Sequence, residues 1–143
     1  MAEIAQAFNW VVTTLQADSA WVAASTGGVF QGRADIGTIA PYTLVTAQTP
    51  GMDVLTVNVK RLFTKITLQI KAVGPMSNYA ALVTIADRID ALFGRVGPTA
   101  LPGQGGVLEC FREQAIAYEE PRLINGQAWS HLGGLYHIDL QGS

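Results

Sequence analysis

The sequence predicts an α+β fold, in which a mostly antiparallel β-sheet carries two main α-helices packed on one face. Apolar residues recur at helical spacing in 2–16 and 77–93, and they alternate with polar residues in 61–72 and 107–118. The strands cluster in meanders around single helices, an order typical of antiparallel sheets. With 143 residues, we expect one domain spanning 1–143, large enough to need no disulfide or metal for stability.

The N-terminal segment is predicted to form the first helix, from Ala2 to Gln16, because its apolar residues gather on one side. These residues are Ile4, Phe8, Val11, Val12 and Leu15. Trp10 falls nearly opposite them, so it is either a singly exposed apolar residue or an anchor for a contact. Asp18-Ser19 then ends the helix or caps a short new turn at 20–24.

The next segments are predicted to supply the first strands. Residues 25–41 read as a loop with short extended pieces, 42–47 as a strand, and 53–59 as a strand or extended loop. A longer strand begins at Arg61, and alternation assigns one of its faces to the core. That face carries Leu62, Thr64, Ile66, Leu68, Ile70 and Ala72.

A bend at Gly74-Pro75 precedes the second helix, for which Ser77 is a plausible N-cap and Gly94 a plausible end. Its apolar stripe consists of Tyr79, Leu82, Ile85, Ala86, Ile89 and Phe93. Both helices and the long strand should therefore share one core. That core is predicted to contain Phe8, Val11, Leu15, Ile66, Leu68, Ile70, Leu82, Ile89 and Phe93.

The C-terminal part is predicted to form a long hairpin. The Gly/Pro-rich segment 96–106 fits no regular element. A strand over 107–118 follows, and Asn125-Gly126 is the best hairpin signal in the chain. The last strand, 128–141, should pair antiparallel with it and contain a bulge at Gly133-Gly134.

The charge content is low, at 14% against about 25% in ordinary globular proteins, while 49% of residues are hydrophobic. We expect copies of the chain or partners to cover much of the surface; the alternative is a compact monomer with a Thr/Gln/Gly-rich exterior. The net charge is −2 and the longest basic cluster is Lys60-Arg61, which disfavours tight or sequence-specific nucleic-acid binding. The N-terminus does not resemble a signal peptide, and no apolar run approaches the ~20 residues of a membrane span.

The sequence offers no ligand set for a metal. Cys110 is the only cysteine, which excludes an intramolecular disulfide and a thiolate zinc cluster, and its alternating context predicts a buried thiol. His131 and His137 are six residues apart and could share a strand face, yet two imidazoles without a third ligand make a poor site. We expect no metal and no cofactor, and synthesis in a reducing compartment.

Carboxylate pairs are the remaining candidates for chemistry. Asp87 and Asp90 lie three apart on the second helix, and Glu119 and Glu120 end a strand before Pro121. General acid–base catalysis needs one carboxyl in a shielded pocket, and both pairs are expected to be solvated. Because no catalytic constellation emerges, we do not expect an enzyme.

The order of segments is the most specific feature of the chain. After the amphipathic first helix come "VFQGRADIGTIAPYTLV", "RLFTKITLQIKAVG", "NYAALVTIADRIDALFG" and "HLGGLYHIDL". This order, from about Ile4 to Leu140, resembles the tail terminator (tail completion) proteins of long-tailed bacteriophages. The matching positions are Gly32-Arg33, Pro41-Tyr42, Ala80, Ala81, Ala86, Ala91, Leu92, His131, Leu135, Tyr136 and Ile138.

The resemblance implies a structural virion protein. Such proteins form a hexameric ring that caps the tail tube, stops its polymerisation and docks the filled head through a connector or neck protein. Genomic DNA passes through the lumen without specific binding. The chain would be made in the host bacterial cytoplasm and end up at the head-proximal end of the tail.

Two sets of residues are candidates for that role. Subunit or partner contacts are assigned to Trp10, Arg33, Lys60 and Arg61. Channel-lining charges are assigned to Asp87, Asp90, Glu119 and Glu120, offset by Arg88 and Arg122, although the same charges could simply face solvent. The alternative functions are another head–tail connector or neck protein, and a small-molecule or peptide-binding α+β module.

Overall fold

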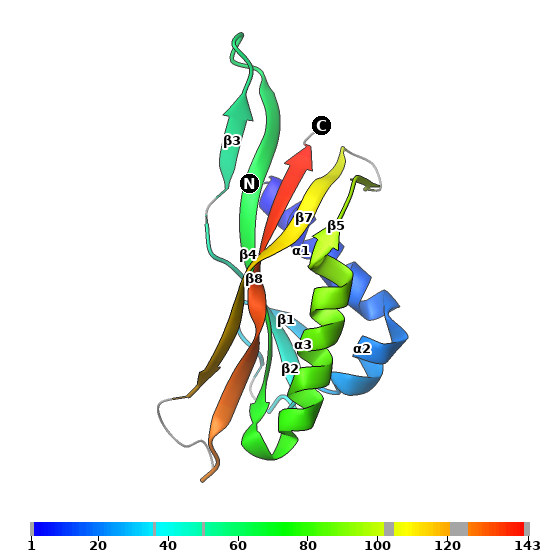
Figure 1. Cartoon of the computed structure of the whole chain (residues 1–143), viewed down its shortest axis with the longest axis vertical. Coiled ribbons are helices and arrows are strands. Elements are labelled where there is room, and N and C mark those ends of the chain that lie inside the picture. Colours follow the sequence, from blue (N-terminus) through cyan, green and yellow to red (C-terminus); the bar gives the residue numbers. More distant parts are fainter. Residues whose placement is uncertain (1, 36, 50, 102–104, 121–125, 142–143) are drawn as a thin grey trace.

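The computed structural model describes residues 2–35, 37–49, 51–101, 105–120 and 126–141. Its elements follow the order helices, strands, helix, strands (Figure 1). They are α1 (Ala2–Ala17), α2 (Ser19–Ala24), β1 (Val29–Gln31), β2 (Tyr42–Ala47), β3 (Met52–Leu55), β4 (Arg61–Pro75), η1 (Met76–Asn78), α3 (Tyr79–Phe93), β5 (Arg95–Val96), β6 (Thr99–Ala100), β7 (Gly106–Glu119) and β8 (Trp129–Gln141).

The strands form one sheet in the order β1-β2-β4-β8-β7-β5, with β3 beside β4 and β6 beside β7. The pair β1–β2 is parallel, and the other described pairs are antiparallel. At its centre, β4 and β8 pair continuously from Thr64↔Leu140 to Pro75↔Trp129. The predicted mostly antiparallel α+β fold is confirmed.

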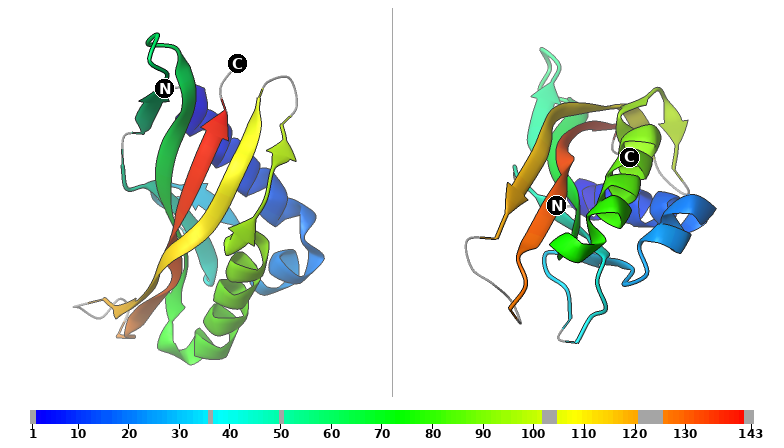
Figure 2. Two further views of the ribbon diagram at one scale, coloured as in Figure 1. Left: turned by 45° about the horizontal axis from the view of Figure 1, so that its top comes forward. Right: turned by 60° about the horizontal axis from the view of Figure 1, so that its bottom comes forward.

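The two main helices pack on one face of this sheet, which curves around them (Figure 2). Alternation along β4 explains how, because Ile66, Leu68 and Ile70 point to the helices while the residues between them are half-exposed. Eight of the nine predicted core residues are completely buried. The ninth, Phe8, is half-buried and packs against the core.

The buried stripe of α1 is rotated from the predicted one. It consists of Glu3, Ala7, Val11 and Leu15. The carboxylate of Glu3 lies 2.6 Å from the guanidinium of Arg61 on β4. This ion pair allows a charged residue to be buried between α1 and the sheet. Helix α1 contacts the sheet on one side and α3 on another. Residues next to its buried stripe, such as Ile4, Phe8 and Trp10, are therefore partly buried as well.

The start of α3 differs from the prediction. A 3-10 turn, η1, precedes the helix, and the N-cap position is Asn78 rather than Ser77, without a side-chain cap bond. Tyr79 lies in the first turn of α3 and is 44% exposed, so it does not belong to the buried stripe. The end is as predicted, because the amide of Gly94 donates to the carbonyl of Asp90 at 2.7 Å.

The predicted bulge at Gly133-Gly134 is wrong. Pairing with β4 and β7 runs through both glycines without a shift, and the shifts lie on β7, at Val107/Glu109 and Arg112/Gln114. A Cβ on Gly133 would lie 2.1 Å from the carbonyl oxygen of Ile70. Glycine is needed there because the neighbouring strand approaches closely.

Three segments depart from the predicted boundaries. In the segment 53–59, only the part up to Leu55 is a strand, β3. Leu62 was assigned to the core face but is 50% exposed, because this end of β4 extends past the core. The segment 96–106 contains β6 and the end of β5, although no regular element was predicted. Pairing of β7 with β8 is antiparallel as expected, while Asn125 of the predicted turn and Arg122 lie outside the described residues.

Candidate functional site

The helix-free face of the sheet carries polar and titratable side chains from its three central strands. At one end of this face, His131 on β8 is nearly buried, and its Nε2 lies 2.6 Å from Oε1 of Glu120. The imidazole stacks on the ring of Tyr118 at 4.4 Å, and Nζ of Lys71 donates to the hydroxyl of Tyr118 at 2.6 Å. Burial lowers the pKa of His131 despite the Glu120 hydrogen bond, so the neutral imidazole is favoured.

His137 lies on the same face, as its spacing from His131 allowed. Its Nε2 is 2.7 Å from Asp139, its Nδ1 is 3.2 Å from Glu113, and its ring packs at 4.9 Å on Phe111. The two carboxylates engage opposite ring nitrogens and therefore do not converge on one point. Within the described parts of the chain, no group of three or more His, Cys, Asp or Glu side chains could hold a metal ion.

Cys110 is a buried thiol, as predicted from its alternating context. Its side chain is fully buried and donates to the carbonyl of Phe93 at 3.2 Å. Burial raises the pKa of Cys110 to about 12, so the thiolate needed for nucleophilic attack is scarce at neutral pH. The residue is structural.

The four candidate channel charges are not brought together. Asp87 is exposed on α3, whereas Asp90 pairs with Arg112 at 3.3 Å. Glu119 is exposed at the far end of β7, and Glu120 binds His131. Arg112 and Glu119 are seven positions apart along β7, a length of about 23 Å of strand.

Arg88 has a structural place. Its guanidinium donates two hydrogen bonds to the carboxylate of Asp18, at 2.7 and 3.0 Å. Asp18 also caps α2 by accepting from the amide of Trp21 at 2.9 Å, which confirms the capping alternative. These hydrogen bonds, with that from Arg88 foremost, lower the pKa of Asp18 and fasten α3 to the start of α2.

The predicted contact residues have different surroundings. Trp10 is half-buried, and its indole meets the ring of Phe93 edge-on at 5.2 Å, so it is not a singly exposed residue. Arg61 is engaged by Glu3, while Arg33 and Lys60 are exposed in loops. Of the four predicted contact residues, Trp10 and Lys60 belong to two surface features, a groove and a projecting hairpin, that were not predicted from the sequence.

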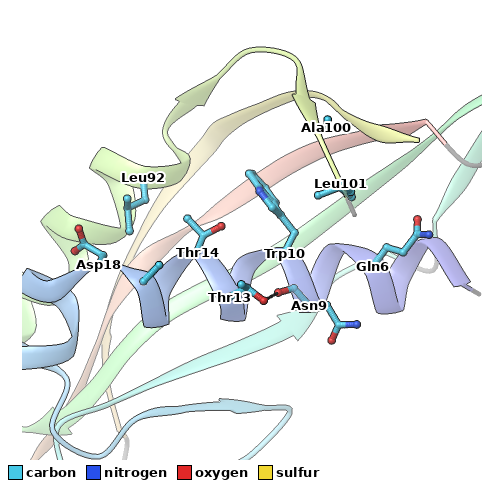
Figure 3. A pocket seen from close by; sticks show the side chains of 10 residues that line it. Gln6, Asn9, Trp10, Thr13, Thr14, Asp18, Leu92, Ala100 and Leu101 are labelled. Atoms are coloured by element: carbon cyan, nitrogen blue, oxygen red, sulfur yellow. Dashed lines mark hydrogen bonds between the residues drawn. The ribbon is translucent and has the colours of Figure 1, made fainter. Parts of the chain in front are cut away.

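The first feature is a groove of about 680 Å³ beside α1, which we call the α1 groove. Figure 3 shows Trp10 rising from α1 between Leu92 of α3 and the segment after β6. The described lining is Gln6, Asn9, Trp10, Thr13, Thr14, Ala17, Asp18, Leu92, Ala100 and Leu101. The groove arises because β6 folds over α1, and sequence periodicity assigned no element there.

The second feature is a projecting hairpin made of β3, the turn at 56–60 and the start of β4, which we call the arm, residues 52–62. It extends beyond the rest of the molecule at one end (Figure 1). Its apolar side chains are largely exposed: Met52 64%, Leu55 51%, Val57 101%, Val59 74% and Leu62 50%. The alternation of apolar residues in 53–59, which predicted a strand or an extended loop, was the sequence signal for this surface.

Solved structures include a similar chain. It belongs to the virion of a native gene transfer agent particle, superposes with a TM-score of 0.64, is 14% identical, and the match covers 92% of each chain. At this identity the likeness shows the shared fold. No protein family and no curated protein matches the sequence. None of the helices in the described residues is long and apolar enough to cross a membrane.

Proposed function

We propose that this chain is a structural protein of a phage-like virion, and that it terminates the tail tube. The observation that carries the proposal is the fold shared with a chain of a gene transfer agent virion over 92% of both molecules. The order of segments, which resembles that of tail terminators, supports the terminator role in particular. The role is one of assembly and needs no catalytic residue, metal or cofactor.

In this role the chain forms a hexameric ring on the last layer of tube subunits. The ring stops tube growth, presents its other side to a connector or neck protein, and lets genomic DNA pass through. Its low charge and the exposed apolar arm suit a subunit whose edges are covered in an assembly. The finished protein lies at the head-proximal end of the tail after synthesis in the bacterial cytoplasm.

The experiment that tests this role is to locate the chain on particles. Gold-labelled antibody against the chain should bind at the joint of head and tail, and cells lacking the chain should make tubes of uncontrolled length without heads. Label on the portal side of the neck, with tubes of normal length, would instead favour a head–tail connector. Absence of the chain from purified particles would refute the proposal.

A further inference from the structure

The arm and the α1 groove lie at opposite edges of the sheet. Where the arm joins the body, paired residues run across the sheet from Asp53 through Thr64, Leu140 and Val107 to Thr99. This row crosses five strands, so β3 and β6 are about 19 Å apart. A surface on one edge that fits a surface on the other creates a head-to-tail contact, which closes into a ring when the rotation allows.

The backbone of the arm is strained at its tip. The turn is closed by hydrogen bonds from Thr56 N to Lys60 O at 2.7 Å and from Val59 N to Thr56 O at 2.9 Å. Val59 adopts φ +60, a left-handed conformation that is unfavourable for a β-branched side chain. A strained turn that presents two exposed valine side chains, Val57 and Val59, is better explained by a contact than by stability of the isolated chain.

The extended part of the arm is shorter than the groove and fits within its length, and the two surfaces agree in polarity. The extended strand of the arm, β3 from Met52 to Leu55, spans about 10 Å, and the turn at 56–60 follows it. The groove follows α1 from Gln6 to Asp18, a rise of about 18 Å. Its wall is apolar at Trp10 and Leu101, which matches the valines of the arm.

Their charges are also complementary. Lys60, at the tip of the arm, is exposed and makes no ion pair with any described residue. Asp18 is the one charged residue in the described lining of the groove. Oδ2 of Asp18 accepts from Arg88 and from the amide of Trp21, and Oδ1 accepts from Arg88, which leaves one lone pair on Oδ1 for a further donor.

We propose that the arm of one copy seats in the α1 groove of the next copy, with Val57 and Val59 against Trp10 and Leu101 and with Lys60 toward Asp18. This inference rests on the proposed ring and supplies its subunit contact. The second copy is the occupant because the chain itself carries both complementary surfaces, at opposite edges.

The test uses two variants that each disable one half of the contact. Val57→Asp places a charge on the arm at a residue that is fully exposed, and Ala100→Arg fills the groove from β6. Thr13→Arg, exposed on α1, blocks the same groove from its other wall and replaces Ala100→Arg if that variant does not fold. Val22→Asp is the matched control, because Val22 is 49% exposed on α2 and belongs to neither surface.

The expected masses distinguish this contact from others. Wild type and Val22→Asp should assemble into rings, whereas Val57→Asp and Ala100→Arg should each remain at the 15.2 kDa of one chain in sedimentation. An equal mixture of the two disabled variants should form dimers and nothing larger, because one intact arm meets one intact groove. Circular dichroism and thermal melting should show all variants folded.

Several outcomes would overturn the inference. They are assembly of Val57→Asp or of the groove variants as in wild type, a mixture that stays monomeric, loss of assembly in Val22→Asp, and a monomeric wild type. Failure of the proposed function is separate, because it is read from where the gold label lies on particles. A ring that forms without the arm leaves that function intact.

Discussion

Leu68 and Ile89 are completely buried, one on the central strand β4 and one on the helix that covers it. Truncation of either side chain removes apolar contacts and leaves a cavity between the layers. We expect Leu68→Ala and Ile89→Ala each to lower the free energy of unfolding by roughly 2–5 kcal/mol in urea titrations. Val83→Ala, on the exposed side of α3, should change it by less than about 0.5 kcal/mol. Equal midpoints for the three variants would show that the buried face is misassigned.

His131 gives stability a pH dependence. Its pKa is lowered in the folded protein, chiefly by burial, so above about pH 7 the residue is neutral in both states and contributes no slope. As pH falls below the unfolded value near 6.5, the unfolded chain takes up the proton first. The free energy of unfolding should therefore drop by up to about 1.4 kcal/mol per pH unit, until folded His131 titrates at its lower pKa.

Urea unfolding between pH 7.5 and 5 measures this slope. His131→Phe keeps a ring stacked on Tyr118 but cannot titrate. We expect the acid-side slope to be shallower in the variant. If the free energy of unfolding falls with pH equally steeply in both proteins, a group other than His131 takes up the proton.

At the scale of elements, periodicity predicted the helices and strands in which one face is buried in the core. The alternating burial of β4 from Phe63 to Ile70 follows the predicted pattern, since one side of the strand meets the core. Strand β2 has the predicted bounds, although three consecutive residues, Thr43, Leu44 and Val45, are buried. The rotation of α1 could not be predicted, because Glu3 is buried by an ion pair with Arg61, which is distant in sequence. Likewise β6 depends on its partner β7 more than on its own two residues.

Gly133 shows how a local signal can mislead. Adjacent glycines in a strand suggest a bulge, whereas here close approach of β4 requires the missing Cβ. Gly133→Ala should lower the free energy of unfolding by roughly 1–3 kcal/mol, because the strands must separate to make room. Gly97→Ala is the control, since a Cβ there meets nothing within 4 Å. Comparable melting temperatures for both variants would contradict the steric explanation.

At the scale of the whole molecule, sequence reasoning identified the residues Trp10 and Lys60 but not the surfaces to which they belong. Lys60 lies on an arm that exists because β3 and β4 pair past the edge of the core. Trp10 lines a groove that exists because β6 folds over α1. Both depend on segments brought together by the tertiary fold, so no periodicity along the chain reports them.

The distribution of charge predicts how a ring of these subunits treats DNA. Arg61, Arg88 and Arg112 are engaged by carboxylates of the same chain. With −2 per chain, a hexamer carries about −12. Because the net charge of the ring is negative and a third of its Lys and Arg residues are already paired, duplex DNA should bind more weakly than micromolar at physiological salt in mobility-shift titrations.

Exposed acids give this prediction an internal control. If Asp87 and Glu119 line the channel, replacing both by lysine changes the charge of a hexamer by about +24, turning a mildly repelling wall into an attracting one. The double variant should then retain duplex DNA, with an affinity that falls steeply as salt is raised. Retention by the variant alone supports passage of DNA past these residues, and unchanged weak binding places them on the outer surface. Tight, salt-sensitive binding by the wild-type protein would contradict a non-retaining channel and indicate a DNA-binding role instead.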